Sequence, residues 1–239
     1  MPDTFAAVLA GRLRHDPGQP FVTFYDDSTG ERVELSVTTY ANWVAKASSL
    51  LVDELGLERG DTLRIDLPTH WLGTVFLGAA WTAGLVVSGD DAPHAVVCGP
   101  GTLDTWAART ATTEVLACSL LPLGVRFREP LPAGVHDVGI EIWSQPDAFI
   151  PYDAPTGADV ALDEPATSQA EMLEAAAAGS LLTDGGRLLS VANPASPPGI
   201  ATFLEPLVRG GSLVLVAQAD PSRLQAMEHA ERTTSRFPA

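Results

Sequence analysis

The sequence has 239 residues, of which 46% are hydrophobic and 18% are charged, so it can bury a core without disulfides or metal ions. Its formal net charge of −16 repels a phosphate backbone and its basic residues form no cluster, which excludes nucleic acid as an expected partner. We expect no membrane insertion, because no apolar run is long enough to span a bilayer. We also expect a cytoplasmic location, because the first residues lack the pattern of an export signal.

The first part of the chain alternates between short strands and helices whose apolar residues recur at three- and four-residue steps. In chain order, the predicted elements are a helix at 5–16, a hairpin at 21–25 and 31–35, a helix at 39–55, a strand at 62–67, a helix at 70–84, and strands at 85–87 and 95–98. Thr69 is expected to cap the helix that ends at Gly84, and this helix is apolar enough to be buried. Lys46, the only lysine, falls off the apolar stripe of its helix and is expected to face water.

Local signals are weaker in the middle of the chain and become clear again at Ser168. Residues 139–143 fit either a strand or a helix. Ser168 and Glu171 have the spacing of a capping box before an alanine-rich helix that Gly179 ends. The other predicted elements are strands at 114–118, 187–191 and 212–217, and helices at 198–209 and 221–232. This alternation predicts an α/β fold with mainly parallel or mixed sheets covered by helices.

Two short motifs resemble binding sites but lack the rest of their pattern. Asp90, Asp91 and His94 are metal-ligand residue types, yet nothing nearby in the sequence completes a ligand set. Residues 98–104 follow a strand but lack the third glycine and the distal acid of a dinucleotide fingerprint. We therefore expect a solvated loop and a strand-to-helix turn at these places, with no metal and no cofactor.

Five segments follow one another in an order that carries a family resemblance. They are Tyr-Ala-Asn-Trp at 40–43, Arg-Gly-Asp-Thr-Leu-Arg-Ile at 59–65, Ala-Gly-Leu-Val-Val at 83–87, Asp-Gly-Gly-Arg-Leu at 184–188, and Leu-Val-Arg-Gly-Gly-Ser-Leu-Val-Leu at 207–215. In this order they resemble the large N-terminal domain of the AMP-forming adenylating enzymes, the superfamily of acyl-CoA synthetases, peptide-synthetase adenylation domains and luciferases. The resemblance implies the fold of that domain in a shortened, degenerate form.

The sequence departs from this family where the family binds phosphate. There, a Ser/Thr/Gly-rich loop ending in Pro-Lys-Gly follows a stretch whose counterpart is 158–162. This chain continues instead with Asp163 and Glu164 and reaches Thr167 and Ser168 without a glycine or a lysine. A triphosphate needs converging backbone N–H groups and usually a cation, whereas a carboxylate about 4 Å from a phosphate costs roughly 1–4 kcal/mol. We expect a degenerate phosphate-loop position that does not hold ATP.

The same resemblance implies where a ligand pocket would open. Its lip would lie near Asn193, Ser196 and Gly199, where the family has an aromatic or histidine-containing turn and this chain has no histidine. The family's adenine-binding strands, ribose-binding aspartate and catalytic lysine have no counterpart in these 239 residues. We therefore assign no catalytic residue.

Two parts are predicted, a first α/β subdomain at 1–157 and a second, truncated α/β segment at 158–239 packed on it. The leading hypothesis is a non-catalytic domain of the adenylating-enzyme fold that binds a protein partner or a small apolar, acyl-type ligand. One alternative is a remnant ligase that forms acyl-adenylates from ATP and a carboxylic acid. The other is a structural subunit that forms a homodimer through the truncated face, because large apolar faces seldom stay exposed.

Overall fold

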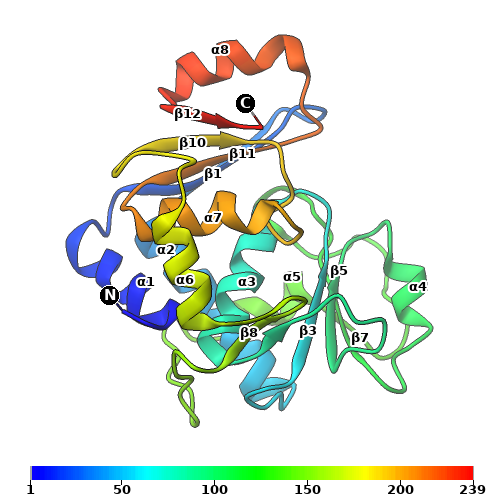
Figure 1. Cartoon of the computed structure of the whole chain (residues 1–239). Coiled ribbons are helices and arrows are strands. Elements are labelled where there is room, and N and C mark those ends of the chain that lie inside the picture. The colour runs from blue at the N-terminus through cyan, green and yellow to red at the C-terminus, as the bar shows by residue number, and fades with distance from the viewer. Residues whose placement is uncertain (1, 239) are drawn as a thin grey trace.

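The computed structural model describes residues 2–238, which form two sheets with helices between and outside them (Figure 1). The α-helices are α1 Phe5–His15, α2 Val37–Ser49, α3 Trp71–Ala83, α4 Leu103–Ala107, α5 Val138–Glu141, α6 Gln169–Ala178, α7 Gly199–Val208 and α8 Pro221–Glu231. A π-helical turn, η1 Leu50–Glu54, continues α2, and two 3-10 turns are η2 Pro122–Gly124 and η3 Ile142–Ser144.

Both sheets are mainly parallel. The strands are β1 Pro20–Asp26, β2 Glu31–Ser36, β3 Thr62–Asp66, β4 Val86–Val87, β5 Ala95–Cys98, β6 Glu114–Ala117, β7 Val135–Asp137, β8 Val160–Asp163, β9 Ala166–Ser168, β10 Arg187–Ser190, β11 Ser212–Ala217 and β12 Ser235–Phe237. The seven-stranded sheet has the order β7-β6-β5-β3-β4-β8-β9, and the five-stranded sheet has the order β12-β10-β11-β1-β2. Only the edge strands β9 and β2 pair antiparallel with their neighbours. The predicted α/β class is confirmed.

The main core lies between the two sheets, where α1, α2, α3 and α7 bury their apolar faces. At its centre, the ring of Phe203 lies within 6.5 Å of four other aromatic rings, measured between centroids. These four rings belong to Phe5, Phe21, Tyr40 and Trp81. Aromatic rings bury large apolar areas, so this cluster ties residues from both ends of the chain to the central helices.

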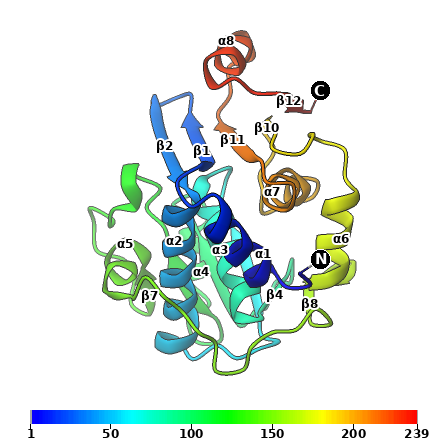
Figure 2. The ribbon, with the colours of Figure 1, turned by 90° about the vertical axis from the view of Figure 1, so that its left-hand side faces the viewer.

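Two further helices cover the outer faces of the sheets. Met227 of α8 packs against Val214 and Val216 of β11, so α8 lies on the side of the five-stranded sheet away from the other helices (Figure 2). Trp106 of α4 packs against Val96 and Val115 on the outer face of the seven-stranded sheet. With both faces covered, the strands read as continuous apolar runs, as parallel strands do.

Three local predictions are corrected by the structure. His70, not Thr69, caps α3, because its Nδ1 accepts from the Leu72 N–H at 3.2 Å. Helix α2 begins two residues before the predicted start at 39, because Ser36 caps it. The side chain of Lys46 does not face water freely, because it is 17% exposed and its Nζ lies 3.1 Å from Asp147.

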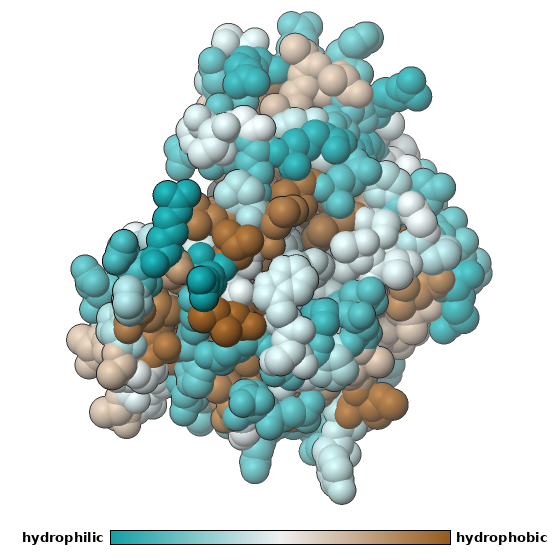
Figure 3. All heavy atoms as spheres, turned by 180° about the vertical axis from the view of Figure 1, so that it is seen from behind, coloured by the Kyte–Doolittle hydropathy of each residue, from teal (hydrophilic) through white to brown (hydrophobic). Residues whose placement is uncertain are grey.

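The predicted division between 157 and 158 does not coincide with the sheets. Strands β1 and β2 pair with strands from the end of the chain, and β8 and β9 complete the sheet that begins at β3. The division stays a prediction, because sheet membership does not test whether a part folds alone. Within residues 2–238, no helix is both long and apolar enough to cross a membrane. From behind, apolar residues reach the surface in several separate places among hydrophilic ones (Figure 3).

Candidate functional site

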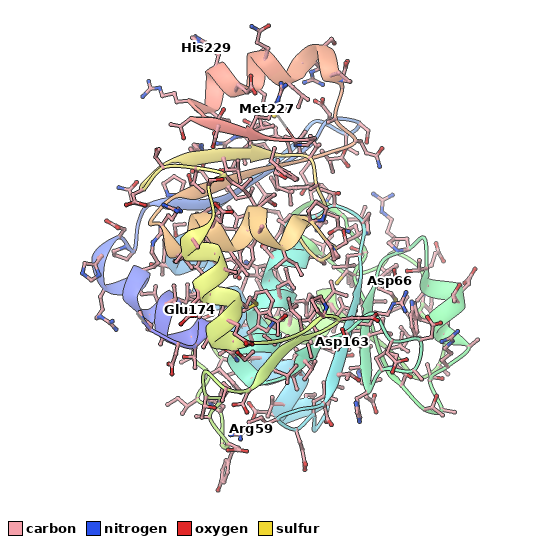
Figure 4. The ribbon with its side chains drawn as sticks, in the orientation of Figure 1. Arg59, Asp66, Asp163, Glu174, Met227 and His229 are labelled. Atoms are coloured by element: carbon pink, nitrogen blue, oxygen red, sulfur yellow. The ribbon has the colours of Figure 1, made fainter. Side chains whose placement is uncertain are left out.

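Three neighbouring parallel strands end at one edge of the seven-stranded sheet. Strand β3 ends at Asp66, β4 is followed by Ser88, and β8 ends at Asp163. In open α/β sheets, ligands bind outside the carboxyl ends of the strands. Figure 4 shows Asp66 and Asp163 on the same side of the molecule, to the right of α6 in this view. This edge is the first place to look for a site.

A cavity of about 770 Å³ opens at this edge and runs between α6 and α7. Its apolar wall comes from the strand ends and from both helices: Leu67, Val87, Leu162, Met172, Ile200 and Leu204. Its polar lining includes four carboxylates and one guanidinium: Asp66, Asp163, Glu164, Glu205 and Arg64. The volume and the mixture of apolar walls with a few polar groups are those of small-molecule sites.

The predicted degenerate phosphate loop is a tight hairpin. Asp163 pairs with Ala166 across β8 and β9, and only Glu164 and Pro165 connect the two strands. The Ser88 hydroxyl donates to the Asp163 carboxylate and accepts from the Asp90 N–H, which orients both groups. The hairpin therefore presents carboxylates at the rim of the cavity, where a triphosphate site would need converging N–H donors.

Among the described residues, one guanidinium lines the cavity, and its Nη1 already has partners. The Arg64 Nη1 donates to the carbonyls of Gly89 and Asp90 at 2.9 and 3.0 Å and lies 2.8 Å from the Asp91 carboxylate. The guanidinium also lies over the Trp106 ring, 5.3 Å from its centroid. Its Nη1 therefore holds the loop after β4, and the Asp91 carboxylate already pairs with its charge.

Two residues of the motif at 90–94, for which we expect no metal, form contacts with other side chains and with the backbone. Asp91 pairs with Arg64, whereas His94 accepts from the Thr62 N–H at 3.0 Å and lies 3.4 Å from the Asp61 carboxylate. These contacts give the two side chains separate structural partners.

A buried thiol lies at the next strand end. Cys98 ends β5 and pairs in register with Asp66. Burial, and secondarily the Asp66 carboxylate, raises the pKa of Cys98 to about 12. Because the thiolate is the reactive form, this raised pKa disfavours Cys98 as a nucleophile at neutral pH.

The predicted lip residues lie in the loop before α7. The Asn193 Nδ2 donates to the Leu67 carbonyl at 2.7 Å, which joins this loop to the end of β3. Asn193 and Ser196 both line the cavity. Gly199 begins α7 behind them, and a Cβ there would lie 1.7 Å from the Asn193 carbonyl oxygen, so only glycine fits.

The other predicted residues divide between the cavity and the helix behind it. Thr167 lines the cavity together with Asp163 and Glu164. Ser168 instead caps α6, accepting from the Glu171 N–H while Glu171 accepts from the Ser168 N–H, as the capping box predicted. Two groups of residues predicted separately, those of the hairpin and those of the lip, therefore surround one cavity.

Sequence reasoning did not single out Arg64, Asp66, Ser88 or Glu205. Asp66 and Ser88 could have been found, because they stand where predicted strands 62–67 and 85–87 end. Glu205 carries no such signal, because it lies within a helix and only the packing of α7 on α6 brings it to the cavity.

Comparison with known proteins places the chain in a family. No family model matches the sequence. A TIGR03089 family protein of Mycobacterium tuberculosis is 37% identical over 237 residues, which cover 95% of this chain and 95% of that protein. The chain belongs to the TIGR03089 family. Its fold is found in solved structures of much lower identity.

Those structures are acyl-CoA synthetases. The TIGR03089 family chain matches a Brucella canis acyl-CoA synthetase with a TM-score of 0.80 and 16% identity, over 98% of this chain and 46% of that one. A Mycobacterium tuberculosis fatty acyl CoA synthetase matches with a TM-score of 0.74 and 15% identity, over 97% of this chain and 48% of that one. The N-terminal domain of FACL13 from the same organism matches with a TM-score of 0.72 and 17% identity, over 96% of this chain and 61% of that one. The chain thus spans about half the length of the first two, and at these identities the likeness establishes the fold alone, as the resemblance predicted.

Proposed function

We propose that this TIGR03089 family protein is a non-catalytic binding domain that holds a small, largely apolar molecule in the cavity between α6 and α7. The observation that carries the proposal is the cavity itself, with its apolar wall of strand ends and helix faces at the carboxyl edge of a parallel sheet. Burial of apolar surface there contributes about 25 cal/mol per Å² removed from water.

The charges at the rim oppose a nucleotide. By the sequence resemblance, Asp163 and Glu164 correspond to the phosphate-loop position of the adenylating enzymes, and both line the cavity. Each carboxylate near a phosphate costs roughly 1–4 kcal/mol at about 4 Å. The Arg64 Nη1 is bonded to the loop after β4 and to the Asp91 carboxylate, and Arg64 is one guanidinium against four carboxylates in the described lining. This supports a protein that retains the fold of the synthetases without using ATP.

Calorimetry with a neutral apolar probe tests the proposal. We expect 1-octanol to bind and to raise the melting temperature, because a ligand that binds only the folded state at 100 times its Kd adds about 2.7 kcal/mol. We expect ATP with Mg²⁺ to do neither, and we expect no pyrophosphate exchange with a panel of carboxylic acids. ATP binding with carboxylate-dependent exchange would instead support an acyl-adenylate-forming ligase.

A matched pair of substitutions locates the binding. Ala201 of α7 is exposed and lines the cavity, so Ala201→Phe should fill the space and abolish octanol binding. Ala178 at the end of α6 is also exposed but lies outside the lining, so Ala178→Phe is the control. Equal octanol affinity in both variants would rule out this cavity as the binding site.

A further inference from the structure

Glu205 contributes a buried carboxylate to the lining of the cavity. Glu205 is 4% exposed and lies on α7 next to Leu204, and both residues line the cavity together with Ala176 of α6. Its Oε2 accepts from the Leu181 N–H at 2.8 Å. No other hydrogen bond reaches this carboxylate within residues 2–238, and no Lys, Arg or His nitrogen there lies within 4.0 Å of it.

The basic side chain at the end of the same helix, Arg209, bonds to other groups through both of its Nη atoms. The Arg209 guanidinium donates to the carbonyls of Ala177 and Gly179 and pairs with Asp184 at 2.9 Å. A carboxylate removed from water is costly unless a cation or further donors compensate it. Glu205 therefore lacks the partner that a buried carboxylate normally has.

Most of the other charged groups that line the cavity are also carboxylates. Asp66, Asp163 and Glu164 line it at the strand ends, and Arg64 is bonded to the loop after β4. The Asp66 carboxylate accepts from the Trp106 Nε1 at 2.6 Å, and among residues 2–238 no Lys, Arg or His nitrogen forms a salt bridge with it. A ligand that enters this cavity meets carboxylates at its mouth and another along the helices.

We propose that the cavity takes an apolar molecule that carries a protonated amine, with the ammonium paired to Glu205 and the apolar body against Leu67, Met172 and Leu204. This rests on the proposed function, because it names the class of ligand for the same cavity. The pairing supplies the missing cation, and ammonium groups donate up to three hydrogen bonds. The carboxylate of a fatty acid or a phosphate group would instead be repelled by Glu205 and by the carboxylates at the mouth of the cavity.

Glu205 also has a structural role, which the test must separate from ligand recognition. Its bond to the Leu181 N–H holds the connection after α6, and Gly179 lies so close that a Cβ there would meet the Glu205 Oε1 at 2.1 Å. Glu205→Gln keeps an acceptor for Leu181 and removes only the charge. Gly179→Ala keeps the charge and displaces the carboxylate, because the backbone at this position suits alanine.

Three probes with one chain length make the measurement: n-octylamine, 1-octanol and n-octanoate, titrated by calorimetry at pH 7. The amine is protonated there, as a lysine side chain is. We expect octylamine to bind at least about tenfold more tightly than octanol, which corresponds to about 1.4 kcal/mol, and octanoate to bind more weakly than either. In Glu205→Gln the ratio of the octylamine affinity to the octanol affinity should fall to near one. The octanol affinity itself should stay within about twofold of that of the wild type.

Controls identify the responsible carboxylate. Glu174 of α6 is exposed and lies outside the cavity, so Glu174→Gln should leave the ratio unchanged (Figure 4). Gly179→Ala should lower the ratio as Glu205→Gln does. The ratio should also persist at 0.5 M NaCl, because a buried pair is screened less than an exposed one.

Several outcomes overturn the proposal. If octanol binds but the amine has no advantage, the ligand class is wrong and the binding domain stands. If no probe binds, both proposals fall. If Asp163→Asn abolishes the amine preference and Glu205→Gln does not, the rim and not Glu205 recognises the cation. If Glu205→Gln does not fold, the salt series and Gly179→Ala still decide between a buried and an exposed pair.

Discussion

Acid should destabilise the protein through His70, the residue that caps α3. Its ring is 4% exposed and packs against Phe24 and Trp71, with ring centroids 4.8 and 5.6 Å away. The Nδ1 accepts from the Leu72 N–H at 3.2 Å, so the neutral ring carries its proton on Nε2, which has no hydrogen-bond partner within residues 2–238. A second proton would have to occupy Nδ1 and break the cap.

The size of this effect follows from the difference between the pKa of His70 in the folded protein and its pKa in the unfolded chain. Burial lowers the pKa of His70 from 6.5 to about 4, and the Asp26 carboxylate opposes this only in part. Below pH 6.5 the unfolded chain takes up a proton that the folded protein does not accept until about pH 4. The stability is therefore fully present above pH 6.5 and falls as the pH drops toward 4. The loss is about 3 kcal/mol over the whole interval and about 2 kcal/mol between pH 7 and pH 5.

Urea unfolding at pH 7 and pH 5 measures this loss. The comparison is with His70→Asn, because asparagine keeps an acceptor at the N-cap and does not titrate. Carboxylates titrate in both proteins, so their contribution cancels in the difference. We expect the free energy of unfolding of the variant to fall by about 2 kcal/mol less than that of the wild type. Equal losses in the two proteins would refute the assignment to His70.

Three further substitutions test packing and capping, each by urea unfolding. Gly78→Ala should lower the free energy of unfolding by about 2 kcal/mol, because a Cβ would lie 2.4 Å from the Tyr40 hydroxyl. The control is Gly18→Ala, where a Cβ would have nothing within 4 Å and the loss should stay under about 1 kcal/mol. Equal losses in the two variants would contradict this account. Arg12→Ala should cost about 3 kcal/mol, because the guanidinium donates to three backbone carbonyls at and after the end of α7, and an unchanged midpoint would argue against that role. Ser168→Ala should cost about 1 kcal/mol as a lost cap and leave octanol affinity unchanged; a large loss of affinity would place Ser168 in the site.

Local elements were predictable because neighbouring residues decide them. The capping box of α6 forms between Ser168 and Glu171 as predicted, and Gly84 ends α3 with φ at 82°. The choice of cap for α3 was not predictable, since Thr69 and His70 both carry an acceptor and only the packing of the His70 ring decides between them. The hairpin of β8 and β9 was missed, because its strands are too short to show an alternating pattern.

The amino-acid sequence alone determined the α/β class, most element positions and the acidic character of residues 163 and 164, because these depend on composition and on contacts within a few residues. Only the tertiary structure decided that the hairpin and the loop at Asn193 enclose one cavity. The Asn193 side chain reaches the Leu67 carbonyl across 126 positions of sequence, and Glu205 reaches the cavity only because α7 packs on α6. Such contacts depend on how sheets and helices stack, and residue spacing along the chain carries no record of that geometry.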